Sequence, residues 1–257
     1  MKTIPIVGKP YVQREALRAI VNRLWAEPGH FYSPIPDVAE VQHKAESVFH
    51  SDRELPGIDL RCGPQLALLE ELRTYQCDMP FTENRQSNHR FFFENPAFSY
   101  CDALLLYSLI RHYRPKRIVE VGCGYSSCVI LDTNERFFQN SIECLFIEPY
   151  PDLLYSLIKE NDRASITVLR QPLQDVSLEP FERLQAGDIL FIDSSHVIKT
   201  QSDVNWVLFE ILPRLTPGVL IHIHDVFYPF EYPPEWVYQG RAWNEAYAVR
   251  AFLQFNV

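Results

Sequence analysis

The 257-residue sequence has no long hydrophobic run and no excess of basic charge. Nowhere do about eighteen apolar residues follow one another, as a membrane-spanning helix requires, and the N-terminus lacks the apolar stretch of a signal peptide. Lys and Arg number 24 against 33 Asp and Glu, a net charge of -9, whereas a nucleic-acid partner needs a basic face. We therefore predict a soluble, cytoplasmic protein that binds neither membrane nor nucleic acid.

Cysteine is also sparse, and its spacing is not that of a metal site. Three of the six cysteines lie within or beside predicted strands, so we expect reduced, mostly buried thiols. The composition, with 47% hydrophobic and 22% charged residues, is typical of a globular protein. Its length suits one large domain, or a domain with an extension.

The first hundred residues combine helical spacing with proline-rich loops. Apolar residues recur at helical intervals over residues 12–25 and again after Gly63-Pro64. We predict residues 1–99 to be a helical, loop-rich extension and residues 100–257 to be the main domain.

From Arg117 onward, strand patterns alternate with helix patterns. The apolar runs are continuous rather than alternating, which indicates a sheet covered by helices on both faces. With right-handed crossovers this predicts an α/β fold with a doubly wound, mainly parallel sheet. The strands are expected at 117–121, 143–147, 166–169, 188–192 and 219–224, with helices at 126–138, 152–160 and 202–212 and a terminal helix near the end of the chain.

Four of the apolar runs end on an acidic residue. These acids are Glu120, Glu148, Asp193 and Asp225. In a parallel sheet they would collect along the carboxyl edge, where open α/β folds bind their ligands. We therefore expect the functional site at that edge.

The first strand then enters a glycine loop with the sequence EVGCGYSS. Gly122 and Gly124 would let the backbone approach a ligand closely, although a structural turn is an equal alternative, and Ser127 replaces the third glycine of the dinucleotide fingerprint. A carboxylate at Glu148 can accept hydrogen bonds from both hydroxyls of a ribose. The alternative for Glu148 is a solvated acid at the end of a strand.

This order of motifs resembles the class I S-adenosylmethionine-dependent methyltransferases over residues 117–225. The motifs are the glycine loop, the acid closing the second strand and the sequence IDSSH closing the fourth. The resemblance implies a Rossmann-like fold and S-adenosyl-L-methionine as cofactor. It also implies a set of cofactor-binding residues: Glu120, Gly122, Cys123, Gly124, Tyr125, Ser126 and Ser127 in the loop, Glu148 at the ribose, Leu173 and Gln174 near the adenine, and Asp193.

The ends of the fourth and fifth strands carry residues suited to catalysis. By resemblance to catechol-type O-methyltransferases, Asp193, His224 and Asp225 would hold a divalent cation, magnesium or manganese. An imidazole ligand shifts the preference away from magnesium, toward manganese, iron or zinc. His196, three residues after Asp193, would be the general base, since imidazole titrates near neutral pH. The alternatives are that His224 is a hydrogen-bonded packing residue and that His196 orients the loop.

A segment rich in proline and aromatic residues follows Asp225 and is predicted to be too constrained for a helix. We expect Tyr228, Tyr232 and Trp236 to form a wall against the acceptor, the alternative being a rigid surface loop packed on the N-terminal extension. The resemblance also implies an antiparallel hairpin after the fifth strand. The sequence shows none before Val257, so the hairpin is missing or the chain is cut short, and a sheet edge would be open unless covered.

We thus predict an enzyme that methylates a hydroxyl of a small-molecule acceptor, such as a sugar or a natural product. Two alternatives stay open. The first is a NAD-dependent oxidoreductase that uses the same loop, and the second is a non-catalytic methyltransferase-like binding module. A homo-oligomer is compatible with either.

Overall fold

The computed structural model describes residues 24–50 and 54–256. By their contacts these residues fall into two compact units. One unit is Gly57–Asp225, and the other combines the chain up to Pro56 with the chain from Val226. The helix predicted over residues 12–25 lies outside the described residues except for its last two.

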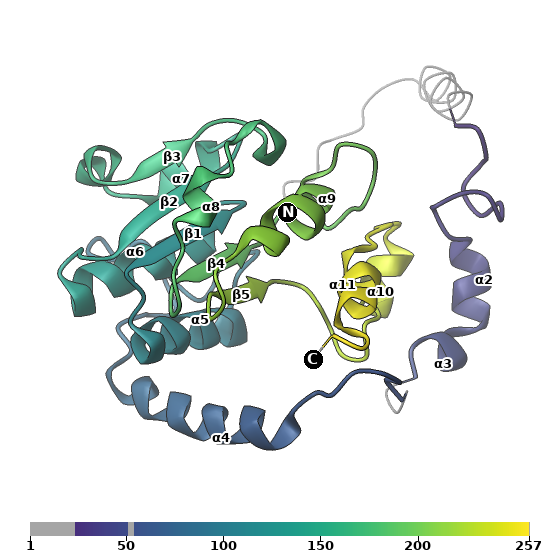
Figure 1. The fold of residues 1–257 in the computed structure, drawn as a ribbon, viewed down its shortest axis with the longest axis horizontal. Coiled ribbons are helices and arrows are strands. Elements are labelled where there is room, and N and C mark those ends of the chain that lie inside the picture. Colours follow the sequence, from purple (N-terminus) through teal and green to yellow (C-terminus); the bar gives the residue numbers. More distant parts are fainter. Residues whose placement is uncertain (1–23, 51–53, 257) are drawn as a thin grey trace. The chain divides into compact units, whose positions relative to one another are not determined.

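The larger unit contains a sheet of five parallel strands, which confirms the predicted α/β fold (Figure 1). The spatial order is β3-β2-β1-β4-β5. The chain therefore changes direction between β1 and β4, and this switch point is where open α/β sheets form their binding crevice. Within the described residues no strand follows β5. The strands are β1 (Arg117–Val121), β2 (Glu143–Ile147), β3 (Thr167–Leu169), β4 (Ile189–Ile192) and β5 (Leu220–Ile223).

The strand register aligns the carboxyl ends of four strands. Val121 pairs with Ile147 on one side and with Ile192 on the other. Ile192 in turn pairs with Ile223. The residues that directly follow these four strands therefore lie side by side along the same edge of the sheet. They are Gly122, Glu148, Asp193 and His224.

Helices cover both faces of the sheet, as its apolar strands require. On one face α5 (Tyr100–Tyr113), α6 (Tyr125–Phe138) and α7 (Asp152–Leu157) contribute to one hydrophobic core. On the other, α8 (Glu179–Glu182) packs with the helix made of α9 (Asp203–Trp206) and the π-helical turn η4 (Val207–Ile211). The other helical elements of this unit are α4 (Cys62–Arg73), η1 (Thr74–Asp78), η2 (Glu160–Ala164), η3 (Leu173–Asp175) and η5 (Leu212–Arg214).

Residues 79–99 pack on the same face of the sheet as α5 and α6. Phe81, Phe91, Phe93 and Phe98 are buried in that core. The sequence predicts that this segment belongs to an extension ending at residue 99, whereas the contacts of the segment group it with the sheet. The reason is that these aromatic side chains need a large apolar surface to cover, and the sheet face provides it.

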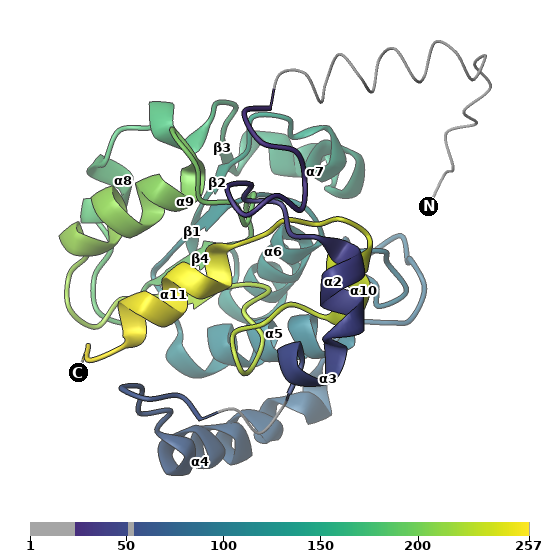
Figure 2. The same ribbon diagram turned by 90° about the vertical axis from the view of Figure 1, so that its right-hand side faces the viewer.

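The smaller unit consists of α2 (Val38–His43), α3 (Ala45–Val48), α10 (Pro234–Tyr238) and α11 (Glu245–Leu253). Within it α2 lies against α10 (Figure 2). The helix α11 confirms the predicted terminal helix. The helix α10 shows that the segment after Asp225 was wrongly predicted to be too constrained for a helix. Pro234 occupies the first helical position, where the missing N–H costs nothing.

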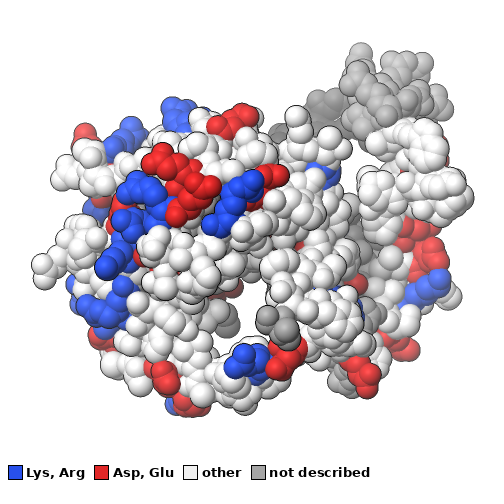
Figure 3. All heavy atoms as spheres, viewed as in Figure 1, with Lys and Arg blue, Asp and Glu red and all other residues white. Residues whose placement is uncertain are grey.

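Acidic and basic side chains lie beside one another on the face shown in Figure 3, which presents no continuous basic surface. In the described part of the chain, none of the helices has the length and hydrophobicity to cross a bilayer.

The six cysteines are free, as predicted. Three of them are exposed rather than buried, because they lie on helical segments outside the sheet: Cys62, Cys77 and Cys101.

Candidate active site

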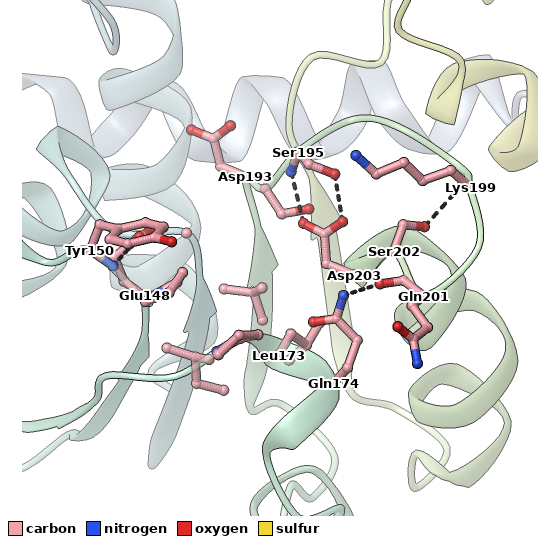
Figure 4. Close-up of a pocket in the computed structure, with 16 residues that line it drawn as sticks. Glu148, Tyr150, Leu173, Gln174, Asp193, Ser195, Lys199, Gln201, Ser202 and Asp203 are labelled. Atoms are coloured by element: carbon pink, nitrogen blue, oxygen red, sulfur yellow. Dashed lines mark hydrogen bonds between the residues drawn. The ribbon is translucent and has the colours of Figure 1, made fainter. Parts of the chain in front are cut away.

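A cavity of about 570 Å³ opens at the carboxyl ends of the strands in the larger unit (Figure 4). Its lining comes from the segments that follow β1, β2, β3 and β4. Five of the predicted cofactor-binding residues lie in this lining. They are Gly122, Glu148, Leu173, Gln174 and Asp193.

The turn after β1 is held tightly against the end of β4. Gly122 has a φ of +83°, and a Cβ at this position would come within 1.8 Å of the carbonyl oxygen of Asp193. The Asp193 N–H donates to the carbonyl of Val121 over 2.9 Å. Only glycine satisfies both the left-handed conformation and this close approach.

Glu148 lies on one side of the cavity, across from Gln174 and Asp203 (Figure 4). Its Oε1 accepts a hydrogen bond of 2.8 Å from the N–H of Tyr150, and its Oε2 accepts one of 3.4 Å from the N–H of Cys123. The carboxylate is thus oriented by backbone donors from both neighbouring segments.

Glu120 is fully buried and does not line the cavity. Its carboxylate accepts hydrogen bonds from the hydroxyls of Ser126 and Ser127. Burial raises the pKa of Glu120 to about 8, although these two hydrogen bonds act in the opposite direction. The Ser127 hydroxyl also accepts the N–H of Gly124 over 3.0 Å. These contacts tie the buried carboxylate to the glycine loop and to the first turn of α6.

The remaining predicted loop residues also lie outside the cavity lining. They are Cys123, Gly124, Tyr125, Ser126 and Ser127.

Other residues that were not predicted from the sequence do line the cavity. Tyr150 is 82% exposed beside Glu148. Asp203, at the start of α9, accepts the backbone N–H and the hydroxyl of Ser195. Ser202 is the N-cap of α9, and acidic Asp203 follows it directly. This N-cap pattern is a sequence signal by which the turn could have been recognised.

Two residues of the cavity lining, Gln174 and Gln201, contact each other. The side-chain amide of Gln174 in η3 donates to the carbonyl of Gln201 (Figure 4). Leu173 beside it is buried. A flat apolar group bound in this part of the cavity would therefore contact the apolar side chain of Leu173 and the amide side chain of Gln174.

A cluster of histidines and aspartates adjoins the cavity through Asp193. The Nε2 atom of His196 lies 3.3 Å from Asp193 Oδ1 and 3.8 Å from Asp225 Oδ2. His196 is only 4% exposed. One ligand atom from each of Asp193, His196 and Asp225 lies within 4.8 Å of the other two, so these three side chains could share a metal ion.

His224 lies within 3.6 Å of three carboxylates in the same cluster, and its buried Nδ1 forms no hydrogen bond. Its Nδ1 lies 3.5 Å from Asp193 Oδ1 and 3.5 Å from Asp225 Oδ1, and its Nε2 lies 3.6 Å from Asp102 Oδ1. Burial alone would lower the pKa of His224, but the three carboxylates outweigh it and raise the pKa to about 12. The pKa of Asp193 is lowered, because its contacts with His196 and His224 outweigh its burial.

His222, two residues before His224, packs against the Phe191 ring at 4.6 Å between ring centroids, and its ring lies 6.4 Å from that of His224. Burial and the neighbouring His224 lower the pKa of His222 to about 4.

The predicted substrate residues belong to the smaller unit. Tyr232 is 4% exposed, and its hydroxyl accepts the N–H of Ala246 over 3.0 Å. The Trp236 ring packs edge-on against Phe227 and Trp243. Tyr228 is exposed. Tyr232 is therefore a core residue of this unit, while Tyr228 presents its ring to solvent. A contact of these residues with an acceptor stays a prediction.

Comparison with known proteins bears on the family of the chain. A family model described as "Methyltransferase domain" matches residues 119–226. An uncharacterised protein of Archaeoglobus fulgidus is 39% identical over 183 residues, which cover 68% of this chain and 82% of that protein. A crystal structure of an SAH-bound methyltransferase from Podospora anserina has a TM-score of 0.42 and 16% identity over 86% of this chain and 90% of that one, a likeness too low to support an inference. With its parallel sheet, glycine turn and acid-lined cavity, the chain belongs to the class I S-adenosylmethionine-dependent methyltransferases.

Proposed function

We propose that the protein transfers the methyl group of S-adenosyl-L-methionine to a hydroxyl of a small-molecule acceptor, assisted by a divalent cation. One observation carries this proposal. Asp193 lines the cavity at the strand ends and also belongs to the histidine–aspartate cluster. A methyl donor in the cavity and an acceptor oxygen at the cluster would therefore meet at one residue.

The cavity lining supports specific roles toward the cofactor. Glu148 would accept the two ribose hydroxyls, and the backbone at Gly122 would lie against the methionine end. Leu173 and Gln174 would contact the adenine. Glu120, held behind the loop by Ser126 and Ser127, would act through the loop rather than touch the cofactor.

The cluster supports the chemistry required on the acceptor side. A hydroxyl must lose its proton as its oxygen attacks the methyl group. A bound divalent cation would polarise that hydroxyl and orient the acceptor. The residues present fit such an ion, because two carboxylates and an imidazole converge within 4.8 Å. This mixed donor set suits manganese, iron or zinc better than magnesium.

The aromatic side chains and the net charge of the chain bear on the class of acceptor. A sugar or another natural-product-like alcohol would be matched by aromatic side chains such as Tyr228 and Trp236. The net charge of -9 disfavours nucleic acid as the acceptor. The proposal includes a cytoplasmic location and a homo-oligomer, which cell fractionation and light scattering would test.

The test is a methyl-transfer assay with labelled S-adenosyl-L-methionine and a panel of acceptors that present a hydroxyl, an amine or a thiol. We expect transfer to at least one hydroxyl compound and loss of turnover after chelation, with S-adenosylhomocysteine still bound in calorimetry. Transfer only to amines or thiols would reject O-methylation. Turnover that is indifferent to chelators would reject the assisting cation.

A further inference from the structure

The two histidines of the cluster, His196 and His224, contact the carboxylates of Asp193 and Asp225 in different ways. His196 Nε2 lies 3.3 Å from Asp193 Oδ1 and 3.8 Å from Asp225 Oδ2. In a tetrahedral site with bonds of 2.0–2.2 Å, neighbouring ligand atoms are about 3.4 Å apart. These distances are close to that spacing, and one ligand atom each from Asp193, His196 and Asp225 lies within 4.8 Å of the other two; among the described residues no such group of three includes His224.

His224 instead lies between these carboxylates and a third one. Its Nδ1 is 3.5 Å from an oxygen of each aspartate, and its Nε2 faces Asp102 at 3.6 Å. Asp225 directs different oxygens to the two histidines, Oδ2 to His196 and Oδ1 to His224. Asp102 comes from the first turn of α5, where its Oδ2 also accepts the N–H of Ser99 over 3.2 Å.

We propose that His196 is the metal ligand of this cluster, together with Asp193 and Asp225, and that His224 is a positioning residue that Asp102 holds against the two ligand carboxylates. The proposal rests on the cation included in the proposed function. It changes the roles predicted from the sequence, where His224 was a ligand and His196 the general base. With His196 bound to the ion, Lys199, whose side chain lines the cavity, is the candidate base.

The chain offers a matched control for the Asp102–His224 contact. Glu71 of α4 lies 3.8 Å from His112 of α5, also through a carboxylate and an imidazole Nε2. Glu71 is exposed and lies outside the cavity lining and the cluster. A substitution there removes the same kind of contact from the same helix without touching the proposed site.

The experiment is titration of the full-length protein with Co²⁺, followed by its visible absorption and by calorimetry. We expect His196→Ala to weaken Co²⁺ binding by more than about a hundredfold, and His224→Asn and Asp102→Asn to weaken it by about tenfold. Glu71→Gln should bind Co²⁺ as the unsubstituted protein does. If His224→Asn loses binding and His196→Ala keeps it, the assignment of the ligand is overturned; unchanged affinity in Asp102→Asn overturns the positioning role.

A second measurement does not require the His196→Ala variant to fold. Mn²⁺ bound to the His224→Asn protein should still show coupling to an imidazole nitrogen in pulsed electron paramagnetic resonance, and the absence of that coupling contradicts His196 as the ligand. Calorimetry with S-adenosylhomocysteine is run on the same samples. Failure of the unsubstituted protein to bind Co²⁺ or Mn²⁺ while it binds S-adenosylhomocysteine would overturn this inference and leave the methyl-transfer assignment in place.

Discussion

At the scale of single residues, Gly122 is the position that sequence and structure explain most fully. The glycine loop could be recognised from the sequence, but the neighbour that makes glycine obligatory could not. That neighbour is the carbonyl oxygen of Asp193, which lies 71 positions further along the chain. The contact exists only because β1 and β4 are adjacent in the sheet.

We expect Gly122→Ala to destabilise the protein strongly. The matched control is Gly187→Ala, because Gly187 has a φ of +88° and no atom within 4 Å of an added Cβ. Gly187→Ala should cost about 1–2 kcal/mol, the strain of the left-handed conformation alone. Gly122→Ala adds a clash with backbone and should cost clearly more. Thermal unfolding of both variants measures the difference, and equal losses would show that the turn yields to the added methyl group.

Glu148 is the residue whose substitution should most directly affect the cofactor. Glu148→Ala removes one or two charge-assisted hydrogen bonds to the ribose, so S-adenosylhomocysteine should bind on the order of tenfold to a hundredfold more weakly. The control is Glu143→Ala at the start of the same strand, where the carboxylate pairs with Arg117 and Arg183. Calorimetry should find that control unchanged. An unchanged dissociation constant in Glu148→Ala would remove Glu148 from the site.

At the scale of elements, the segment before α5 depends on one buried cation. Arg90 is 4% exposed and forms ion pairs with Asp132 and Glu135 of α6 and with Asp162 of η2. This network fixes residues 79–99 to the helical layer over the sheet.

We expect Arg90→Ala to lower the free energy of unfolding by about 3–5 kcal/mol, because it leaves buried carboxylates without their partner. Arg73→Ala is the control, since Arg73 pairs with Glu70 on the surface of α4. That exposed pair should contribute at most about 1 kcal/mol. Denaturant unfolding compares the two variants. A small loss for Arg90→Ala would mean that Asp132 and Asp162 find other partners or become protonated.

The strands were predictable because each is a short apolar run bounded by polar residues. The bounds of β1 and β2 coincide with the prediction, and β3, β4 and β5 are one or two residues shorter than expected. The helix predicted at 202–212 does begin at Asp203, but turns π-helical from Val207. No local pattern in the sequence predicts that change; Val207 and Ile211, at the two ends of the π-helical turn, are buried in the core.

The site was predictable where its residues directly follow strands and unpredictable where they come from elsewhere. Glu148, Asp193 and Asp225 follow from the sequence alone. The contact of Asp102 with His224 does not, since Asp102 lies on a helix 122 positions away. Likewise, Glu120 has the right sequence position for a cofactor ligand, yet two serine hydroxyls engage it behind the loop.

At the scale of the whole molecule, the two compact units should respond differently to the cofactor. All residues that line the cavity belong to Gly57–Asp225. We expect S-adenosylhomocysteine to slow hydrogen exchange in the segments around Gly122, Glu148, Gln174 and Ser195, because a bound ligand stabilises the state that binds it. The smaller unit, including α10 and α11, should exchange as before. Mass spectrometry of the exchanged peptides resolves these regions, and equal protection of α11 would show that the units are coupled on binding.

The close approach of Gly122 to the Asp193 backbone has a practical consequence for engineering. In the proposed function, the turn at Gly122 lies against the methyl donor and Asp193 faces the acceptor, and these two positions share one backbone contact. A redesign that enlarges the turn to admit a bulkier donor analogue would push Asp193 out of its place. Donor and acceptor scope in this enzyme should therefore be altered together, with compensating changes in both loops.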